Sequence, residues 1–269
     1  MTTQSTHDAD VVVVGGGVAG LTAALFTARA GLDTLVLTDG ESILRRNAHL
    51  ENVPGFPAGV NPRLFADLLA EQAERNGVAV EMARVVDVSP VEPGGFDVSV
   101  VAGEGGDDLD THRARYVVAA SWSDASYLPE EVDCRDTGSK TFVGEDGVGR
   151  TAVAGLYAAG RLAETYHQVV VAAGHGASVG ITLVHDSATP FYNDWVTPDG
   201  YFTDRGREVP PGCEEIGPDE QARRQAESRE LMREYFAEPH AQRQRTHPSL
   251  VDDERGRVDE PWSVEADGD

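Results

Sequence analysis

The sequence predicts an α/β protein organised around a parallel sheet, and three observations in the first forty residues carry this prediction. Residues 9–14 form a short apolar, β-branched run without alternation, which is typical of a buried parallel strand. A glycine-rich turn follows, and residues 21–30 are rich in helix formers, with Gly31 as the expected helix C-cap. Residues 34–37 predict a second strand. Strand, glycine turn, helix and strand in this order indicate a Rossmann-like βαβ unit that binds a dinucleotide.

The glycine turn at residues 15–20 has the spacing that a bound pyrophosphate requires. Gly15 permits the tight turn, Gly17 lets the backbone approach the phosphates, and Gly20 lets the helix pack closely on the strand. The helix N-terminus, which includes Ala19, offers N–H groups and a positive dipole end. The alternative is a glycine turn with a structural role alone.

An acidic residue is expected after the second strand to bind a ribose hydroxyl. Asp39 lies 19 positions beyond Gly20 and fits this role. Thr38, one residue earlier, is the competing candidate.

The charge argues against a nucleic-acid-binding function and indicates the ionic medium in which the protein works. The chain of 269 residues has 46 acidic and 22 basic residues, a net charge of −24, and Lys140 is its single lysine. So few cations cannot form a basic face, which argues against nucleic-acid binding. The acidity is spread over the chain, with −13 on residues 1–184 and −11 on residues 185–269. This pattern resembles proteins of salt-loving microbes with a saline cytoplasm; an ordinary acidic protein from a GC-rich genome is the alternative.

Other sequence signals indicate a soluble cytoplasmic protein. Cys134 and Cys213 are 79 positions apart and form neither a CxxC motif nor a disulfide framework, and no metal site is expected. The polar N-terminus lacks the basic flank of a signal peptide. The longest weakly polar stretch, residues 169–184, is interrupted by His175 and by Gly and Ser, so no membrane span is expected.

Three further blocks carry a family resemblance. Residues 51–57 read ENVPGFP, residues 150–160 read RTAVAGLYAAG, and Tyr166-His167-Gln168 precede a helical stretch. With these blocks the chain resembles the thioredoxin reductase-like flavoproteins of the pyridine nucleotide-disulfide oxidoreductase family. The resemblance implies a Rossmann-like, three-layer FAD-binding domain with a small β-meander near residues 96–120, and it implies FAD as the cofactor of the glycine turn.

The resemblance also implies a flavin half of the site. Gln168, at a helix start, can bond a flavin carbonyl and stabilise negative charge on the reduced ring. His167 matches a position near the flavin and is a candidate for proton transfer, against the alternative of a solvent-facing or core histidine. Arg161 replaces the family's aspartate near the ribityl chain, and its donors could instead reach the pyrophosphate. The other cofactor-binding positions that the resemblance implies are Asn52, Val85, Ser121, Gly160 and Val169.

The chain departs from the family between its two blocks. After Pro129 only about twenty residues pass before Arg150, so an NADPH-binding domain with its CxxC motif is expected to be deleted near residues 130–148. Trp122 stands where the family has a glycine. It is interpreted either as an aromatic cover over the flavin or as a core residue that fills the gap left by the deletion.

The domain prediction is therefore an FAD-binding domain at residues 1–184 and an acidic C-terminal extension at residues 185–269. The extension is expected to be irregular and helical, to pack on the flavin domain, to contain one helix at about residues 219–237 and to end in disorder.

Two functions remain open at this level. The first is an FAD-dependent oxidoreductase without its own nicotinamide domain, supplied with electrons by a ferredoxin-like protein, a diffusible reductant or a homodimer partner. The second is a catalytically inert flavin-fold protein that acts as a binding or regulatory partner. Neither a nucleic acid nor a membrane is expected among its partners.

Overall fold

The structure, a computed structural model, describes residues 8–102, 109–191, 193–242 and 244. Five strands pair in parallel in the order β3-β2-β1-β5-β8. Their bounds are Ala9–Val14 for β1, Thr34–Thr38 for β2, Ala79–Pro90 for β3, Leu109–Ala119 for β5 and Leu156–Ala158 for β8. The central strand β1 is buried almost throughout, as its unbroken apolar run predicts.

The outer parts of β3 and β5 leave this sheet and form a second layer. They pair antiparallel with β4 (Phe96–Ala102), which gives the expected β-meander. The sequence predicts two separate strands here, near residues 78–81 and 85–88, and this prediction is wrong. The strand is continuous because its first part pairs with β2 and the rest pairs with β4. Its register on β4 shifts between Val85 and Asp87.

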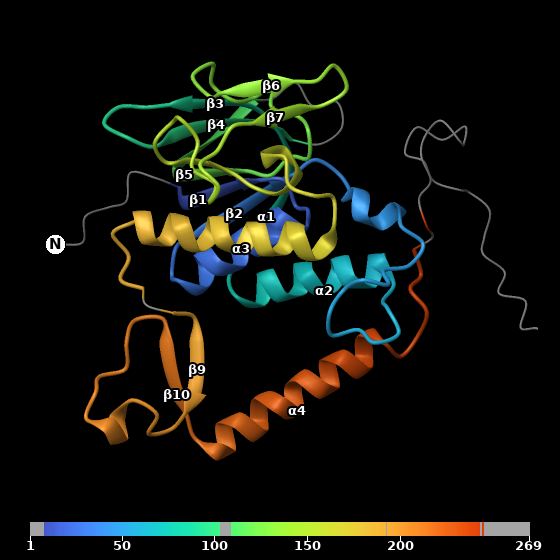
Figure 1. Ribbon diagram of the computed structural model, residues 1–269, viewed down its shortest axis with the longest axis vertical. Helices are drawn as coiled ribbons and strands as arrows, with labels where there is room; N and C mark the ends of the chain where they lie inside the picture. The colour runs from blue at the N-terminus through green and yellow to red at the C-terminus, as the bar shows by residue number, and fades with distance from the viewer. Residues whose placement is uncertain (1–7, 103–108, 192, 243, 245–269) are drawn as a thin grey trace, which may run out of the picture.

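Helices cover the opposite face of the parallel sheet. Figure 1 shows α1 (Val18–Arg29), α2 (Pro62–Arg75) and α3 (Val169–Asp186) on one side and the β3-β4-β5 layer on the other. The three-layer Rossmann-like prediction is thereby confirmed. Gly176 and Gly180 let α3 approach α1, since an added Cβ would lie 2.2 Å from the Ala19 carbonyl oxygen and 2.8 Å from that of Ala23.

Among the described residues, α3 alone is long and apolar enough to cross a membrane by length and composition. Here its glycine face packs against α1, and Val179, Leu183 and Val184 are fully buried. This packing places one face of α3 in the core, while Val170 and Val171 near its start are exposed.

Between β5 and β8 the chain makes turns and one small hairpin. Its strands are β6 (Cys134–Asp136) and β7 (Thr141–Val143), paired antiparallel. A 3-10 turn, η2, follows β8 at Gly160–Ala163 and leads toward α3.

The C-terminal extension contains more regular structure than expected. Two short parallel strands, β9 (Trp195–Pro198) and β10 (Cys213–Ile216), flank a 3-10 turn at Thr203–Arg205. The helix α4 spans Pro218–Tyr235, where a helix at about 219–237 was predicted. The predicted disordered end falls on residues 245–269, outside the described residues.

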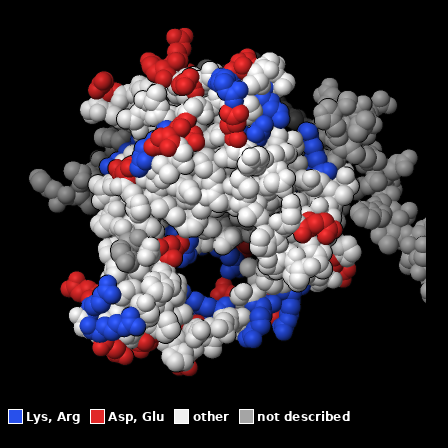
Figure 2. All heavy atoms as spheres, in the orientation of Figure 1, with Lys and Arg blue, Asp and Glu red and all other residues white. Residues whose placement is uncertain are grey.

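The extension contacts the helical side of the rest of the molecule. The Phe236 ring stacks on Phe56 at a centroid distance of 6.4 Å, and Arg75 of α2 pairs with Glu227 of α4 at 2.9 Å. Figure 2 shows an uncharged surface over α3, whereas acidic and basic side chains gather over the extension and the opposite end of the molecule.

Candidate cofactor-binding site

A cavity of about 950 Å³ opens at the carboxyl ends of β1, β2 and β5, where α/β sheets bind their ligands. Its volume lies at the upper end of the range for small-molecule pockets, as an extended dinucleotide requires. The cavity brings together most of the predicted cofactor positions: Gly15, Gly17, Ala19, Thr38, Asp39, Asn52, Val85, Ser121, Arg161, His167, Gln168 and Val169.

Gly20 and Gly160 do not line the cavity. An added Cβ on Gly20 would lie 2.0 Å from the Gly15 carbonyl oxygen, so its role is the close packing of helix on strand. Gly160 has φ +69° and a position for an added Cβ 2.6 Å from the Ala19 Cβ. Both glycines therefore shape the wall of the cavity from behind.

The glycine turn has the geometry of a phosphate cradle. Gly15 has φ +113°, and an added Cβ would lie 2.6 Å from the Ala120 carbonyl oxygen. At Gly17 an added Cβ would meet only the Ser42 hydroxyl, at 3.9 Å, so the backbone faces open space. The N-terminus of α1 has neither a side-chain cap nor an acidic residue in its first turn. Its N–H groups and dipole are therefore available to an anionic ligand.

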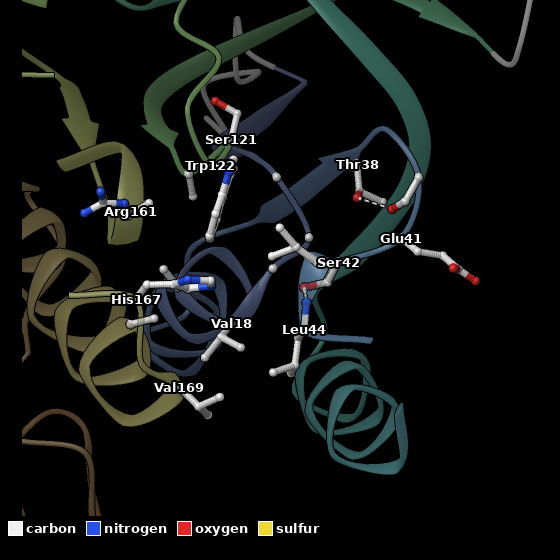
Figure 3. A pocket seen from close by; sticks show the side chains of 18 of the residues that line it. Val18, Thr38, Glu41, Ser42, Leu44, Ser121, Trp122, Arg161, His167 and Val169 are labelled. Atoms are coloured by element: carbon white, nitrogen blue, oxygen red, sulfur yellow. Dashed lines mark hydrogen bonds between the residues drawn. The ribbon is translucent and has the colours of Figure 1, made fainter. Parts of the chain in front are cut away.

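Both candidates for the ribose contact lie at the cavity wall. The Thr38 hydroxyl donates to the Gly40 carbonyl oxygen at 3.3 Å, which stabilises the turn after β2. Figure 3 places Thr38, Ser42 and Leu44 on the side of the cavity opposite Arg161 and His167. Asp39 also lines this wall, so both residues remain candidates.

The flavin side of the cavity joins two distant segments of the chain. The Asn52 side chain donates to the Gln168 amide oxygen at 2.7 Å, which links the ENVPGFP segment to the start of α3. Gln168 is the N-cap residue of α3, its side chain does not cap the helix, and the first turn contains no acidic residue. The Gln168 amide N–H₂ and the α3 N-terminus therefore present donors at this end of the cavity.

Trp122 and His167 meet at the rim of the cavity. Their rings lie 4.3 Å apart, edge to face, and Figure 3 shows the indole in the middle of the cavity view beside the imidazole. Trp122 has φ +66°, a left-handed conformation that is a clear outlier for a bulky side chain. Burial, together with Arg161 and Lys140, lowers the pKa of His167. His167 is therefore neutral at pH 7 and can accept a proton.

Arg161 turns toward the β6–β7 hairpin. Its guanidinium lies 4.7 Å from the centre of the Phe142 ring, and its Nη1 donates to the Thr165 carbonyl oxygen at 3.1 Å. Figure 3 shows this side chain pointing away from Trp122. Its Nε is buried and has no hydrogen-bond partner, and the same is true of Nε in Arg46, which also lines the cavity.

Two supports of the site could not be identified from local sequence patterns. The Gly160 N–H donates to Nδ1 of His175 at 3.0 Å, so this imidazole fixes the turn behind the cavity. Arg63, which is 3% exposed, donates to the carbonyl oxygens of Arg45 and Asn47 and holds the loop that borders the cavity. Neither residue belongs to a motif, and only contacts between distant segments reveal these roles.

The residues present fit FAD. The cavity is large enough for a dinucleotide, its glycine turn leaves the α1 N-terminus uncapped, and the buried Nε of Arg46 has no hydrogen-bond partner. Among the described residues, no group of three or more His, Cys, Asp and Glu could hold a metal ion. Cys134 and Cys213 are both free.

Sequence comparisons agree with this site. A family model described as an FAD binding domain matches residues 10–50. The bifunctional thioredoxin reductase/thioredoxin of Mycobacterium leprae is 39% identical over 131 residues, which is 47% of this chain and 27% of that protein. The thioredoxin reductase of Mycolicibacterium smegmatis is 36% identical over 129 residues, 47% of this chain and 38% of that protein. The matches thus span well under half of these relatives.

Solved structures match the fold. The atypical thioredoxin reductase of Desulfovibrio vulgaris aligns with a TM-score of 0.52 at 18% identity, over 65% of this chain and 97% of that one. An oxidoreductase from Agrobacterium tumefaciens aligns with a TM-score of 0.56 at 16% identity, over 66% and 97%. The chain is thus similar to thioredoxin reductases over about half of its length and shares their fold, and the matched FAD binding domain indicates FAD as its cofactor.

Proposed function

We propose that this protein is an FAD-dependent oxidoreductase whose chain has no nicotinamide domain and no redox dithiol, and which receives electrons from a partner protein or a diffusible reductant. The observation that carries the proposal is the segment between β5 and β8. Its regular structure consists of the short hairpin of β6 and β7, whereas a nucleotide-binding domain needs at least one βαβ unit. Residues 1–184 act as the FAD-binding domain and residues 185–269 as an extension.

The two cysteines support the same proposal. Cys134 lies on β6 and Cys213 on β10, and neither lines the cavity. Burial and nearby Asp133 raise the pKa of the Cys134 thiol, which disfavours the reactive thiolate. A dithiol relay within this chain has no support from these positions.

Each part of the cavity has a role in this proposal. Bound FAD supplies hydride and single-electron chemistry. The Gly15–Ala19 turn binds the phosphates, Thr38 or Asp39 binds a ribose, and the backbone near Val85 and Ser121 borders the adenosine half. Gln168 and the α3 N-terminus orient the flavin end beside Asn52 and Val169. His167 exchanges protons with the reacting group, since its lowered pKa leaves it neutral at pH 7.

For the electron donor we propose only a chemical class of partner. The relatives are named thioredoxin reductases, so a small redox protein is the first partner to test, with a ferredoxin-like donor as our preferred class. The second partner to test is another copy of this chain, which in a homodimer would supply the groups that a single chain lacks. The −24 charge and near absence of lysine support a saline cytoplasm as the setting, where short Debye lengths weaken self-repulsion.

Purification in high salt followed by visible spectroscopy tests the proposal. A yellow protein with bound FAD is expected. A folded, colourless protein that takes up no added FAD would instead support the alternative of a catalytically inert binding partner. Anaerobic reduction of the isolated yellow protein by NADPH would contradict the proposal that this chain lacks a nicotinamide-binding site.

A substitution in the cradle sharpens this test. Gly17→Asp has room for its side chain, because an added Cβ meets only the Ser42 hydroxyl at 3.9 Å, but it places a carboxylate against the phosphates. It is expected to fold normally and to lose FAD. Gly174→Asp is the matched control, since an added Cβ at Gly174 meets nothing within 4 Å and Gly174 lies outside the cavity. Retention of FAD by Gly17→Asp would contradict the assigned phosphate cradle.

A further inference from the structure

Three segments distant in the sequence bring cations and aromatic rings together where Trp122, Arg161 and His167 line the cavity, with Lys140 and Phe142 beside them. Trp122 follows β5, Lys140 and Phe142 belong to the β6–β7 hairpin, and Arg161 and His167 lie between β8 and α3. The Lys140 ammonium lies 6.0 Å from the centre of the Trp122 ring, and the His167 ring lies 4.3 Å from it. We call Trp122, Lys140, Arg161 and His167 the basic rim.

The two cations of the basic rim that are charged at pH 7, Lys140 and Arg161, form no ion pair with a carboxylate among the described residues. The described part of the chain contains no ion pair of Lys140 or Arg161, whereas nine other arginines are paired. The carboxylates nearby are engaged elsewhere: Glu164 pairs with Arg135, and Asp124 accepts from the Ser126 N–H and hydroxyl. Arg135 and, more weakly, Arg161 lower the pKa of Glu164, but no described carboxylate pairs directly with Arg161 or Lys140.

A second observation points to a ligand. Arg161 Nε and the Thr165 hydroxyl are both buried without a hydrogen-bond partner. A buried unsatisfied donor costs stability unless another group satisfies it. Phe142 holds the Arg161 guanidinium from one side, so the side chain is positioned although nothing yet accepts from its Nε.

The strain at Trp122 agrees with a binding role. The left-handed backbone at φ +66° is costly for an indole, and such outliers concentrate at functional sites. The Ser121 hydroxyl, which bonds to the Asp124 carbonyl oxygen at 2.6 Å and to Tyr127 Oη at 2.7 Å, holds the turn in place. The flat indole is thereby kept at the rim of the cavity, between the ammonium of Lys140 and the imidazole of His167.

We propose that the basic rim binds a small organic carboxylate with a flat apolar body, as the substrate or product subsite beside the flavin. Lys140 binds the carboxylate, Arg161 adds positive charge from the side of Phe142, Trp122 contacts the flat body, and His167 faces the reacting end. The inference rests on the proposed function, because it places this subsite next to a bound flavin. It does not need the family's dithiol chemistry.

The test uses benzoate as the probe and benzamide as its neutral match, at constant ionic strength. In a Trp195→Phe/Trp262→Phe background Trp122 is the single tryptophan, so its fluorescence reports binding with or without FAD. Saturable quenching by benzoate, with much weaker quenching by benzamide, is expected. In the FAD-loaded protein the flavin spectrum should shift over the same benzoate range, and the NMR titration of His167 should move to higher pH.

Charge-removing variants assign the effect to residues. Lys140→Gln and Arg161→Gln should each weaken benzoate binding about fivefold, the upper range for a half-exposed ion pair. Arg205→Gln and Arg207→Gln are matched controls, since these arginines also lie over aromatic rings, at 4.4 and 5.7 Å, but in the extension. They should leave benzoate binding unchanged.

The outcomes separate the two proposals. Equal binding of benzoate and benzamide, or equal effects of the rim and extension variants, would overturn the carboxylate subsite even in a yellow protein. A colourless protein whose Trp122 fluorescence still responds to benzoate would retain the anion site and overturn the flavin-dependent function.

Discussion

Residues 9–186 and the C-terminal extension are held together by different forces. The first region buries continuous apolar clusters on both faces of its sheet, with Val12, Val36 and Leu183 at 1% exposure or less. In the extension, α4 has 18 residues and buries none of them, while Arg223 and Arg224 each bond two glutamates. Exposed ion pairs contribute little each, whereas apolar burial dominates stability. The cavity is therefore built on the stable region, and the extension adds contacts to its outer side.

The largest expected contrast comes from one substitution made in both regions. Leu183→Ala should destabilise the protein by about 2–5 kcal/mol, because it opens a cavity in a fully buried cluster. Leu231→Ala on α4 should cost less than about 1 kcal/mol, since α4 buries no side chain. Chemical denaturation of both variants in the same salt measures the difference. Equal losses would show that the extension is part of the main core.

A smaller contrast lies within α3 itself. Gly176→Ala should destabilise by about 1–3 kcal/mol, because the new Cβ would lie 2.2 Å from the Ala19 carbonyl oxygen. Gly174→Ala, two residues away, meets nothing within 4 Å and should stabilise the helix by roughly 0.5–1 kcal/mol. The thermal midpoints of the two variants should therefore move in opposite directions. A shift of the same sign would contradict the close packing of α3 on α1.

His175 predicts a pH dependence of the region that bears the site. Burial lowers its pKa, and its Nδ1 must stay unprotonated to accept from the Gly160 N–H. The unfolded chain therefore binds a proton more readily, so stability should fall as the pH drops below the ordinary histidine pKa of about 6.5. Nearby Glu145 acts in the opposite direction.

Two variants isolate this effect. His175→Asn keeps an acceptor near the Nδ1 position and removes the titration, so the fall in thermal midpoint between pH 7.5 and 5.5 should shrink. His175→Ala should lose stability at both pH values, because the Gly160 N–H then lacks its partner. An unchanged pH profile in both variants would assign the dependence to other groups.

The smallest expected effect concerns the junction of the two regions. Arg75 of α2 bonds Glu71 within its own helix and Glu227 of α4. Arg75→Gln should leave the global stability almost unchanged, because exposed ion pairs contribute little. Hydrogen exchange in α4 should nevertheless become faster, because one link to the flavin domain is lost. No change in α4 exchange would mean that Phe236 and its neighbours hold the extension alone.

Sequence patterns predicted the elements that depend on neighbouring residues. The β1–turn–α1–β2 unit and α4 follow from local periodicity, caps and glycine spacing, so their positions were predicted within a few residues. The β6–β7 hairpin and the β9–β10 pair were missed. These strands have three or four residues each, too few for a period to be detected, and they form because a partner strand pairs with them.

The candidate site divides in the same way. The glycine cradle and the two ribose candidates were identified from the sequence, since a few adjacent residues define them. Other contacts of the site join residues far apart in the sequence. The Asn52–Gln168 bond spans 116 positions and the His175–Gly160 bond spans 15, and the basic rim combines three separate segments. No local pattern records such contacts.

By itself, the sequence determined the dinucleotide-binding fold and the order of its elements, because those properties follow from backbone freedom and apolar periodicity over short stretches, and its family resemblance implied FAD. The tertiary structure alone decided that Gly20 and Gly160 support the cavity wall and that Arg161 turns toward Phe142. It also decided that Lys140 reaches Trp122. These outcomes depend on how distant segments pack, and packing is set by the whole core at once.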